Sequence, residues 1–83
     1  MPVVAIVDGM LIMFFFNDHD PPHFHVDCGD FRAKVSIATL KIIDGELPPH
    51  KRRRVLEWAG EHQEALSAAW EAVQNRRKPG RIE

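Results

Sequence analysis

The sequence predicts an α+β fold, in which a small antiparallel β-meander of four to five strands precedes one long C-terminal helix. Two apolar runs joined by Asp8-Gly9 and an alternation of polar and apolar residues over 23–37 indicate the strands. Apolar residues with helical spacing between positions 55 and 73 indicate the helix. We expect a single domain over residues 1–83, with the meander in 1–47, the helix in 48–78 and a tail in 79–83.

The first two strands are predicted over residues 3–7 and 10–16. Both runs are apolar, and the Asp8-Gly9 pair between them is typical of a two-residue hairpin turn. The second run does not alternate. It therefore fits a central strand that is covered on both faces, or a strand with one face at an interface.

Residues 17–22 are predicted to form a loop, because Pro21 and Pro22 are incompatible with a central strand. Residues 23–28 alternate and are predicted as the third strand. A tight turn at Gly29-Asp30 leads to a fourth strand over 31–37, and residues 40–43 form a short fifth strand.

The helix is predicted to begin at Pro48-Pro49, because proline is well tolerated in the first helical turn. Its apolar stripe has a spacing of 4, 3, 4, 3 and 4 residues and consists of Val55, Ala59, His62, Leu66, Ala69 and Val73. A continuous helix over 49–77 would be about 40 Å long, whereas the meander would be about 25 Å wide. Part of the helix should therefore overhang the sheet, unless the helix bends at Gly60.

The overhanging half of the helix leads us to expect an intermolecular contact. Leu66, Trp70 and Val73 would present an apolar surface that a monomer rarely exposes. Tryptophan is a frequent anchor residue in protein interfaces. We therefore expect these three residues to bind a second copy of the chain or a small partner protein.

The loop and the third strand carry a concentration of histidines and aspartates. His23 and His25 are two positions apart on a strand, so their side chains should share a face. Together with His19 they are candidate ligands of a divalent metal such as zinc. The carboxylates that could complete such a site are those of Asp18, Asp20 and Asp27.

Two other interpretations of this stretch remain open. In the first, a histidine performs acid–base chemistry without a metal and Asp18 or Asp20 orients it. In the second, the stretch is a polar turn with no chemical role, in which Asn17 and Asp18 bind nearby backbone N–H groups. No cofactor is required by the sequence alone.

Basic residues occur at two further places. Arg32 and Lys34 share a face of the fourth strand, where they could bind an anion with His25 or pair with acids on the third strand. The run Lys51-Arg52-Arg53-Arg54 could contact phosphate or an acidic partner, or form a solvated helix face. The formal net charge of −1 makes nucleic acid the weaker of the partner hypotheses.

The cellular setting predicted by the sequence is the cytoplasm. Cys28 is the one cysteine, and a lone thiol fits a reducing compartment. The apolar N-terminal stretch over 2–16 is interrupted by Asp8-Gly9, lacks a preceding basic segment and is too short to span a bilayer. We expect neither a signal peptide nor a membrane span.

Two sequence patterns resemble a known family. The motif N-D-H-D-P-P-H-F-H-V at 17–26 and the helix pattern V-L-E-W-A-x-x-H-x-x-x-L-x-x-x-W at 55–70 are similar to those of short, mostly bacterial proteins classified as domain of unknown function 4160. The resemblance implies a neighbouring gene for a second small protein, of domain of unknown function 2442. It thereby implies a two-gene complex, for which a toxin–antitoxin pair is one model. It implies no catalytic residue.

Two functions therefore remain open, and the sequence leaves undecided whether the protein is an enzyme. The first is a protein–protein interaction component of such a two-gene complex. The second is a metal- or histidine-dependent hydrolase of a phosphodiester such as RNA. Its catalytic group would be drawn from Asp18, His19, His23 and His25, near Arg32 and Lys34.

Overall fold

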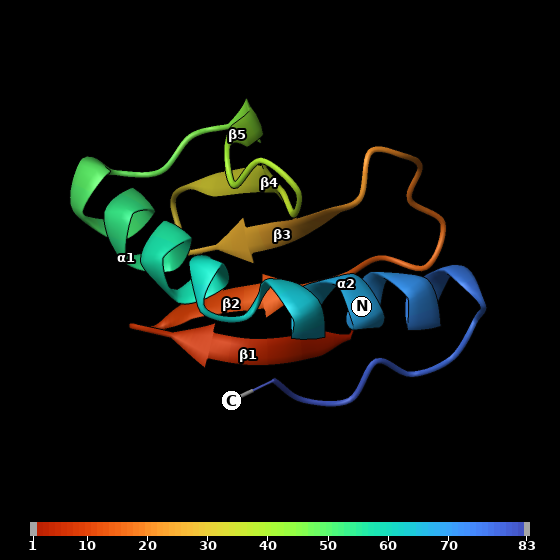
Figure 1. Cartoon of the computed structure of the whole chain (residues 1–83). Coiled ribbons are helices and arrows are strands. Elements are labelled where there is room, and N and C mark those ends of the chain that lie inside the picture. Colours follow the sequence, from red (N-terminus) through yellow and green to blue (C-terminus); the bar gives the residue numbers. More distant parts are fainter. Residues whose placement is uncertain (1, 83) are drawn as a thin grey trace.

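The computed structural model describes residues 2–82; the end residues of the expected 1–83 domain, Met1 and Glu83, lie outside this range. In this part of the chain five strands precede two helices (Figure 1). The strands are β1 (Val3–Val7), β2 (Met10–Met13), β3 (His23–Asp27), β4 (Arg32–Ser36) and β5 (Ile42–Gly45). The helices are α1 (Pro49–Gly60) and α2 (Gln63–Gln74).

The strands form one antiparallel sheet in the order β1-β2-β3-β4-β5, which confirms the predicted meander. The Asp8-Gly9 hairpin has positive φ at both residues, 49° and 80°. In the β3–β4 pair, Asp27 lies opposite Arg32 and His25 lies opposite Lys34. This register brings the polar positions of the two strands onto one face of the sheet.

The limits of β3 and β4 differ from those predicted by no more than one residue at either end, and those of β2 and β5 differ by more. β2 ends at Met13 rather than at residue 16, and the chain then enters the loop that leads to β3. β5 begins at Ile42 instead of residue 40 because Leu40 has a φ of 58° and its N–H bonds back to the carbonyl of Ser36. Leu40 is therefore part of a turn and not of an extended strand.

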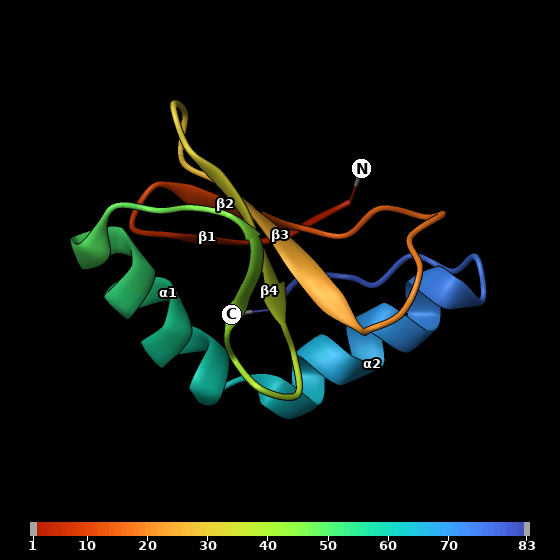
Figure 2. The same cartoon turned by 90° about the horizontal axis from the view of Figure 1, so that it is seen from above.

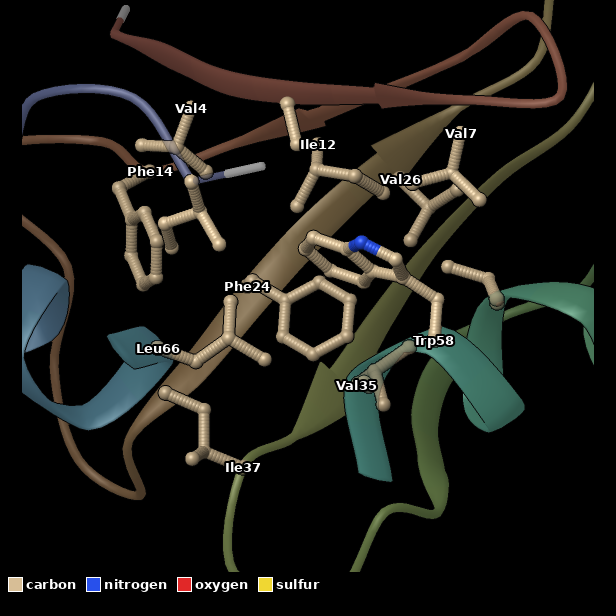
Figure 3. Close-up of a cluster of buried hydrophobic side chains, with 14 of the residues drawn as sticks. Val4, Val7, Ile12, Phe14, Phe24, Val26, Val35, Ile37, Trp58 and Leu66 are labelled. Carbon is tan, nitrogen blue, oxygen red and sulfur yellow. The ribbon is translucent and has the colours of Figure 1, made fainter. Parts of the chain in front are cut away.

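Both helices pack on the same face of the sheet and diverge from each other as a V, while no helix covers the opposite face in residues 2–82 (Figure 2). The core lies between the helices and this inner face. Phe24 from β3 lies between Trp58 of α1 and Leu66 of α2 (Figure 3). The Phe24 and Trp58 rings meet edge to face at 6.5 Å between centroids.

The prediction of one long helix is wrong, because the helix is broken between Gly60 and Gln63. The N–H groups of Glu61 and His62 bond to the carbonyls three residues before them, of Trp58 and Ala59. At His62 the backbone φ of −131° is no longer helical. The longest dimension of the molecule is 33 Å, which is shorter than the continuous helix of about 40 Å. The break lets both halves cover the sheet.

The predicted intermolecular contact on this helix is also wrong. Leu66, Trp70 and Val73 are buried within the chain itself, with exposed fractions of 0%, 7% and 0%. The apolar stripe thus forms the chain's own core. No helix in residues 2–82 is both long and apolar enough to cross a membrane.

The basic run at the start of α1 contacts the first hairpin. Arg54 Nε lies 3.3 Å from the carboxylate of Asp8, and Lys51 Nζ donates to the Asp8 carbonyl at 2.8 Å. Two members of the run therefore hold α1 against the β1–β2 turn. Arg52 and Arg53 are exposed.

The C-terminal segment runs back along β1 (Figure 1). The backbone N–H of Ile82 donates to the carbonyl of Val4 at 2.6 Å, and Arg81 Nε donates to the same oxygen at 3.3 Å. The Ile82 side chain is buried. The tail therefore partly covers the outer edge of the sheet at β1.

Candidate functional site

Asp18, His23 and His25 come together at the start of β3. His25 Nε2 lies 2.8 Å from Asp18 Oδ2, and His23 Nε2 lies 3.2 Å from the same oxygen. One ligand atom from each of the three residues lies within 4.8 Å of the others. The alternation of β3 places both imidazoles on one face, as predicted, and the loop that Pro21 and Pro22 shape returns Asp18 to them.

The ring nitrogens of His23 have unequal surroundings. Nδ1 lies 2.7 Å from the Pro21 carbonyl oxygen, which only accepts, so Nδ1 carries a proton. Nε2 is buried and makes no hydrogen bond within residues 2–82. Its 3.2 Å separation from Asp18 Oδ2 is short enough for an ion pair but is not aligned for a hydrogen bond. In the neutral ring, Nε2 therefore keeps an unshared lone pair 3.2 Å from a carboxylate oxygen.

Three side chains that the sequence analysis did not assign to this site support it. Phe15 stacks on His25 at 3.9 Å between ring centroids, and Trp70 lies 5.3 Å from His23. Gln74 Nε2 donates to the backbone carbonyl of Asp18 at 3.1 Å. Trp70 and Gln74 lie one helical turn apart on α2, so α2 closes one side of the loop.

Other predicted ligands lie outside this cluster. His19 and Asp20 are exposed on the loop, so Asp18 takes the third place for which His19 was proposed. Asp27 accepts from the backbone N–H of Gly29 at 2.9 Å and pairs with Arg32 Nε at 3.3 Å. Asp27 thus serves the β3–β4 hairpin instead of the His23–His25 pair.

A groove of about 340 Å³ lies on the uncovered face of the sheet, and His25 is one of its lining residues. Leu11, Met13 and Phe15 give it an apolar part. Its charged residues are Asp27, Arg32, Lys34 and Asp44. Arg32 pairs with Asp27, and Lys34 Nζ lies 3.8 Å from Asp44. The two predicted anion-binding residues therefore line the groove with acidic neighbours.

One comparison with known proteins identifies a family. The family described as Domain of unknown function (DUF4160) matches residues 9–71. The chain belongs to this family. No curated protein and no solved structure matches the chain.

The DUF4160 match begins at Gly9 in the first hairpin and ends at Glu71 in α2. It contains all three residues of the cluster and the two flanking rings, Phe15 and Trp70. The Gln74 contact and the tail along β1 lie beyond it. The matched segment therefore contains the whole candidate site, but some of the contacts that support the site lie outside the segment.

The arrangement is compatible with two kinds of chemistry. Two imidazole nitrogens and a carboxylate oxygen are a ligand set for a divalent transition metal. Alternatively, Asp18 accepts the Nε2 proton of His25 and orients this ring for acid–base catalysis. Both depend on the same three side chains.

Proposed function

We propose that the chain is a hydrolase of phosphodiesters such as RNA, and that its catalytic groups are Asp18, His23 and His25. The observation that carries the proposal is the 2.8 Å contact between His25 Nε2 and Asp18 Oδ2. It fixes the orientation of an imidazole that also lines the groove on the open face of the sheet. A histidine held by a carboxylate is a common arrangement for a general base.

In the neutral ring of His25, Nε2–H donates to Asp18 and leaves the lone pair on Nδ1. The base would remove a proton from a water molecule as its oxygen attacks phosphorus. A new P–O bond then forms while the bond to the leaving oxygen breaks, and that oxygen takes up the proton that His25 removed from water. Stacking on Phe15 limits rotation of the His25 ring during this step.

Arg32 and Lys34 support a phosphate-containing substrate. Both line the groove with His25, and the Arg32 side chain is 80% exposed despite its contact with Asp27. Its guanidinium can therefore turn to phosphate oxygens, for which arginine is well suited. The single free thiol, Cys28, agrees with a cytoplasmic setting for this activity.

The test is hydrolysis of a short single-stranded RNA and of a nitrophenyl phosphodiester by the purified chain, each with and without a chelator. His25→Gln and Asp18→Asn should lower the rate about 100-fold or more. The matched control is His19→Gln, which changes an exposed histidine on the same loop. The proposal is refuted if wild type hydrolyses neither substrate, or if all variants hydrolyse the substrates at the wild-type rate.

A second function is supported by a different observation: within residues 2–82, four large apolar side chains are exposed. Ile6 is 58% exposed, Ile43 is 46% exposed, and Phe16 and Phe31 are each 36% exposed. We propose on this basis that the chain also serves as a protein–protein interaction component. The partner would be a second copy or the neighbouring small protein of a two-gene complex of toxin–antitoxin type.

Co-expression of the two proteins followed by size-exclusion chromatography with light scattering tests this second function. Ile6→Asp and Ile43→Asp should abolish co-elution and leave the melting temperature unchanged, because both side chains are already hydrated. The control is Thr39→Asp at another exposed position. If wild type is monomeric and the two proteins elute separately at micromolar concentration, the interaction hypothesis is wrong.

A further inference from the structure

We infer that Asp18, His23 and His25 bind one divalent transition-metal ion of the zinc class. The inference rests on the proposed function because it names the cofactor of the same site. With an ion bound, Nε2 of His25 would be a ligand in place of its hydrogen bond to Asp18, so His25 would hold the ion instead of acting as the base. It is nevertheless tested separately, since binding of an ion can be measured without any substrate. Four properties of the site lead to it.

The first property is the unpaired nitrogen of His23. The residue is 5% exposed, and its Nε2 has no hydrogen-bond partner in residues 2–82. A buried polar atom without a partner destabilises the folded state. Because Nδ1 is committed to the Pro21 carbonyl, the ring cannot turn Nε2 toward another partner without losing that bond. A cation bound between His23 Nε2 and Asp18 Oδ2 would give the nitrogen a partner and would balance the charge of the carboxylate.

The second property is the spacing of the ligand atoms. Two ligand atoms at about 2.1 Å from one ion, at tetrahedral or octahedral angles, lie about 3.0–3.4 Å apart. The two nitrogens lie 3.2 Å and 2.8 Å from Asp18 Oδ2, close to this range. An outward movement of a few tenths of an ångström by His25 would bring its distance from Asp18 Oδ2 into this range.

The third property is the composition of the ligand set. Two imidazoles and one carboxylate favour zinc, iron, cobalt or nickel over calcium, magnesium and manganese, which are better suited to oxygen ligands. Three protein ligands leave at least one coordination position for water or substrate, as in catalytic metal sites. When bound, such an ion can activate water for hydrolysis.

The fourth property is the support behind the ligands. A metal-binding histidine commonly donates its other ring nitrogen to a backbone carbonyl, and His23 Nδ1 already does so with Pro21. Gln74 fixes the backbone of Asp18, and Phe15 packs on the ring of His25. These contacts hold the three ligands in place before any ion binds, which lowers the entropic cost of binding.

The test is isothermal titration of the metal-free full chain with zinc chloride and, separately, with manganese and magnesium chloride. Cobalt chloride provides a visible absorption spectrum that reports the ligands directly. We expect one zinc ion per chain, a cobalt spectrum typical of nitrogen and oxygen ligands, and no magnesium binding at the same concentrations. Zinc should also raise the melting temperature.

The variants are Asp18→Asn, His23→Gln and His25→Gln, with His19→Gln as the matched control. Each of the three should weaken zinc binding at least tenfold, while His19→Gln should match wild type. Because His23 is buried, circular dichroism is recorded for each variant, and the inference can be judged on the two less buried ligands, Asp18 and His25, alone. Wild type that binds no zinc, or zinc binding that survives both Asp18→Asn and His25→Gln, overturns it.

The outcomes for the metal and for the hydrolase differ. Chelator-resistant hydrolysis that needs His25, in a chain that binds no zinc, refutes the metal site and leaves a histidine-dependent hydrolase. One bound zinc ion without hydrolysis of either phosphodiester keeps the metal site and refutes the proposed reaction.

Discussion

The indole ring of Trp70 lies 5.3 Å from the imidazole of His23, measured between centroids. This contact joins the C-terminal half of α2 to the start of β3. It also places a buried aromatic side chain directly behind the candidate site. Trp70 is therefore a core residue of this chain with a supporting role at the site.

Trp70→Ala is expected to destabilise the fold. Removing a buried tryptophan side chain costs about 3–5 kcal/mol in the free energy of unfolding, because it leaves a cavity. Urea denaturation followed by circular dichroism measures this change, and Trp70→Phe, which retains an aromatic ring, should cost less. If the variant kept wild-type stability and lost only a binding partner, Trp70 would be an interface residue instead.

Gly45→Ala is expected to be more harmful than Gly29→Ala. Both glycines have positive φ, +77° and +90°, so alanine at either position incurs backbone strain of about 1–2 kcal/mol. A Cβ at Gly45 would in addition collide with the backbone carbonyl oxygen of Arg32, whereas the space at Gly29 is open. The additional cost should be about 1–3 kcal/mol. Equal melting temperatures for the two variants would contradict this account.

The ion pair between Asp8 and Arg54 is expected to contribute little. The two side chains are 41% and 39% exposed, so solvent and salt screen their attraction. A double-mutant cycle with Asp8→Ala and Arg54→Ala should give a coupling energy of about 0.2–1 kcal/mol. The coupling should fall as the salt concentration rises, and Arg53→Ala is the exposed control. A coupling above about 2 kcal/mol would show a stronger role for the basic run.

Ile82→Ala is expected to lower stability, because the tail packs against β1. The side chain is 8% exposed and its backbone N–H bonds to Val4. Loss of a buried isoleucine side chain costs about 2–5 kcal/mol, and a position at the rim of the core should lie near the lower value. The neighbouring Arg81→Ala, at an exposed position, should cost less than about 1 kcal/mol. Unchanged denaturation of Ile82→Ala would show that this contact contributes nothing.

The sequence alone determined the antiparallel meander, because its signals are local. The Asp8-Gly9 turn requires positive φ, and the alternation in β3 and β4 decides which side chains share a face. The same alternation predicted that the side chains of His23 and His25 share a face. It also predicted that Asp27 and Arg32 would be cross-strand partners.

Only the tertiary structure decided where the helices break and pack, and which residues form the site. The apolar stripe passes through residues 60–62 in phase, so the periodicity of apolar residues could not reveal the break there. The break occurs because two short helices cover the inner face of the sheet better than one long helix. Likewise, the choice of Asp18 over His19 depends on how the loop returns to β3. The contribution of Gln74 depends on contact between residues 56 positions apart. Such long-range contacts arise from packing of the whole core, and no single stretch of sequence predicts them.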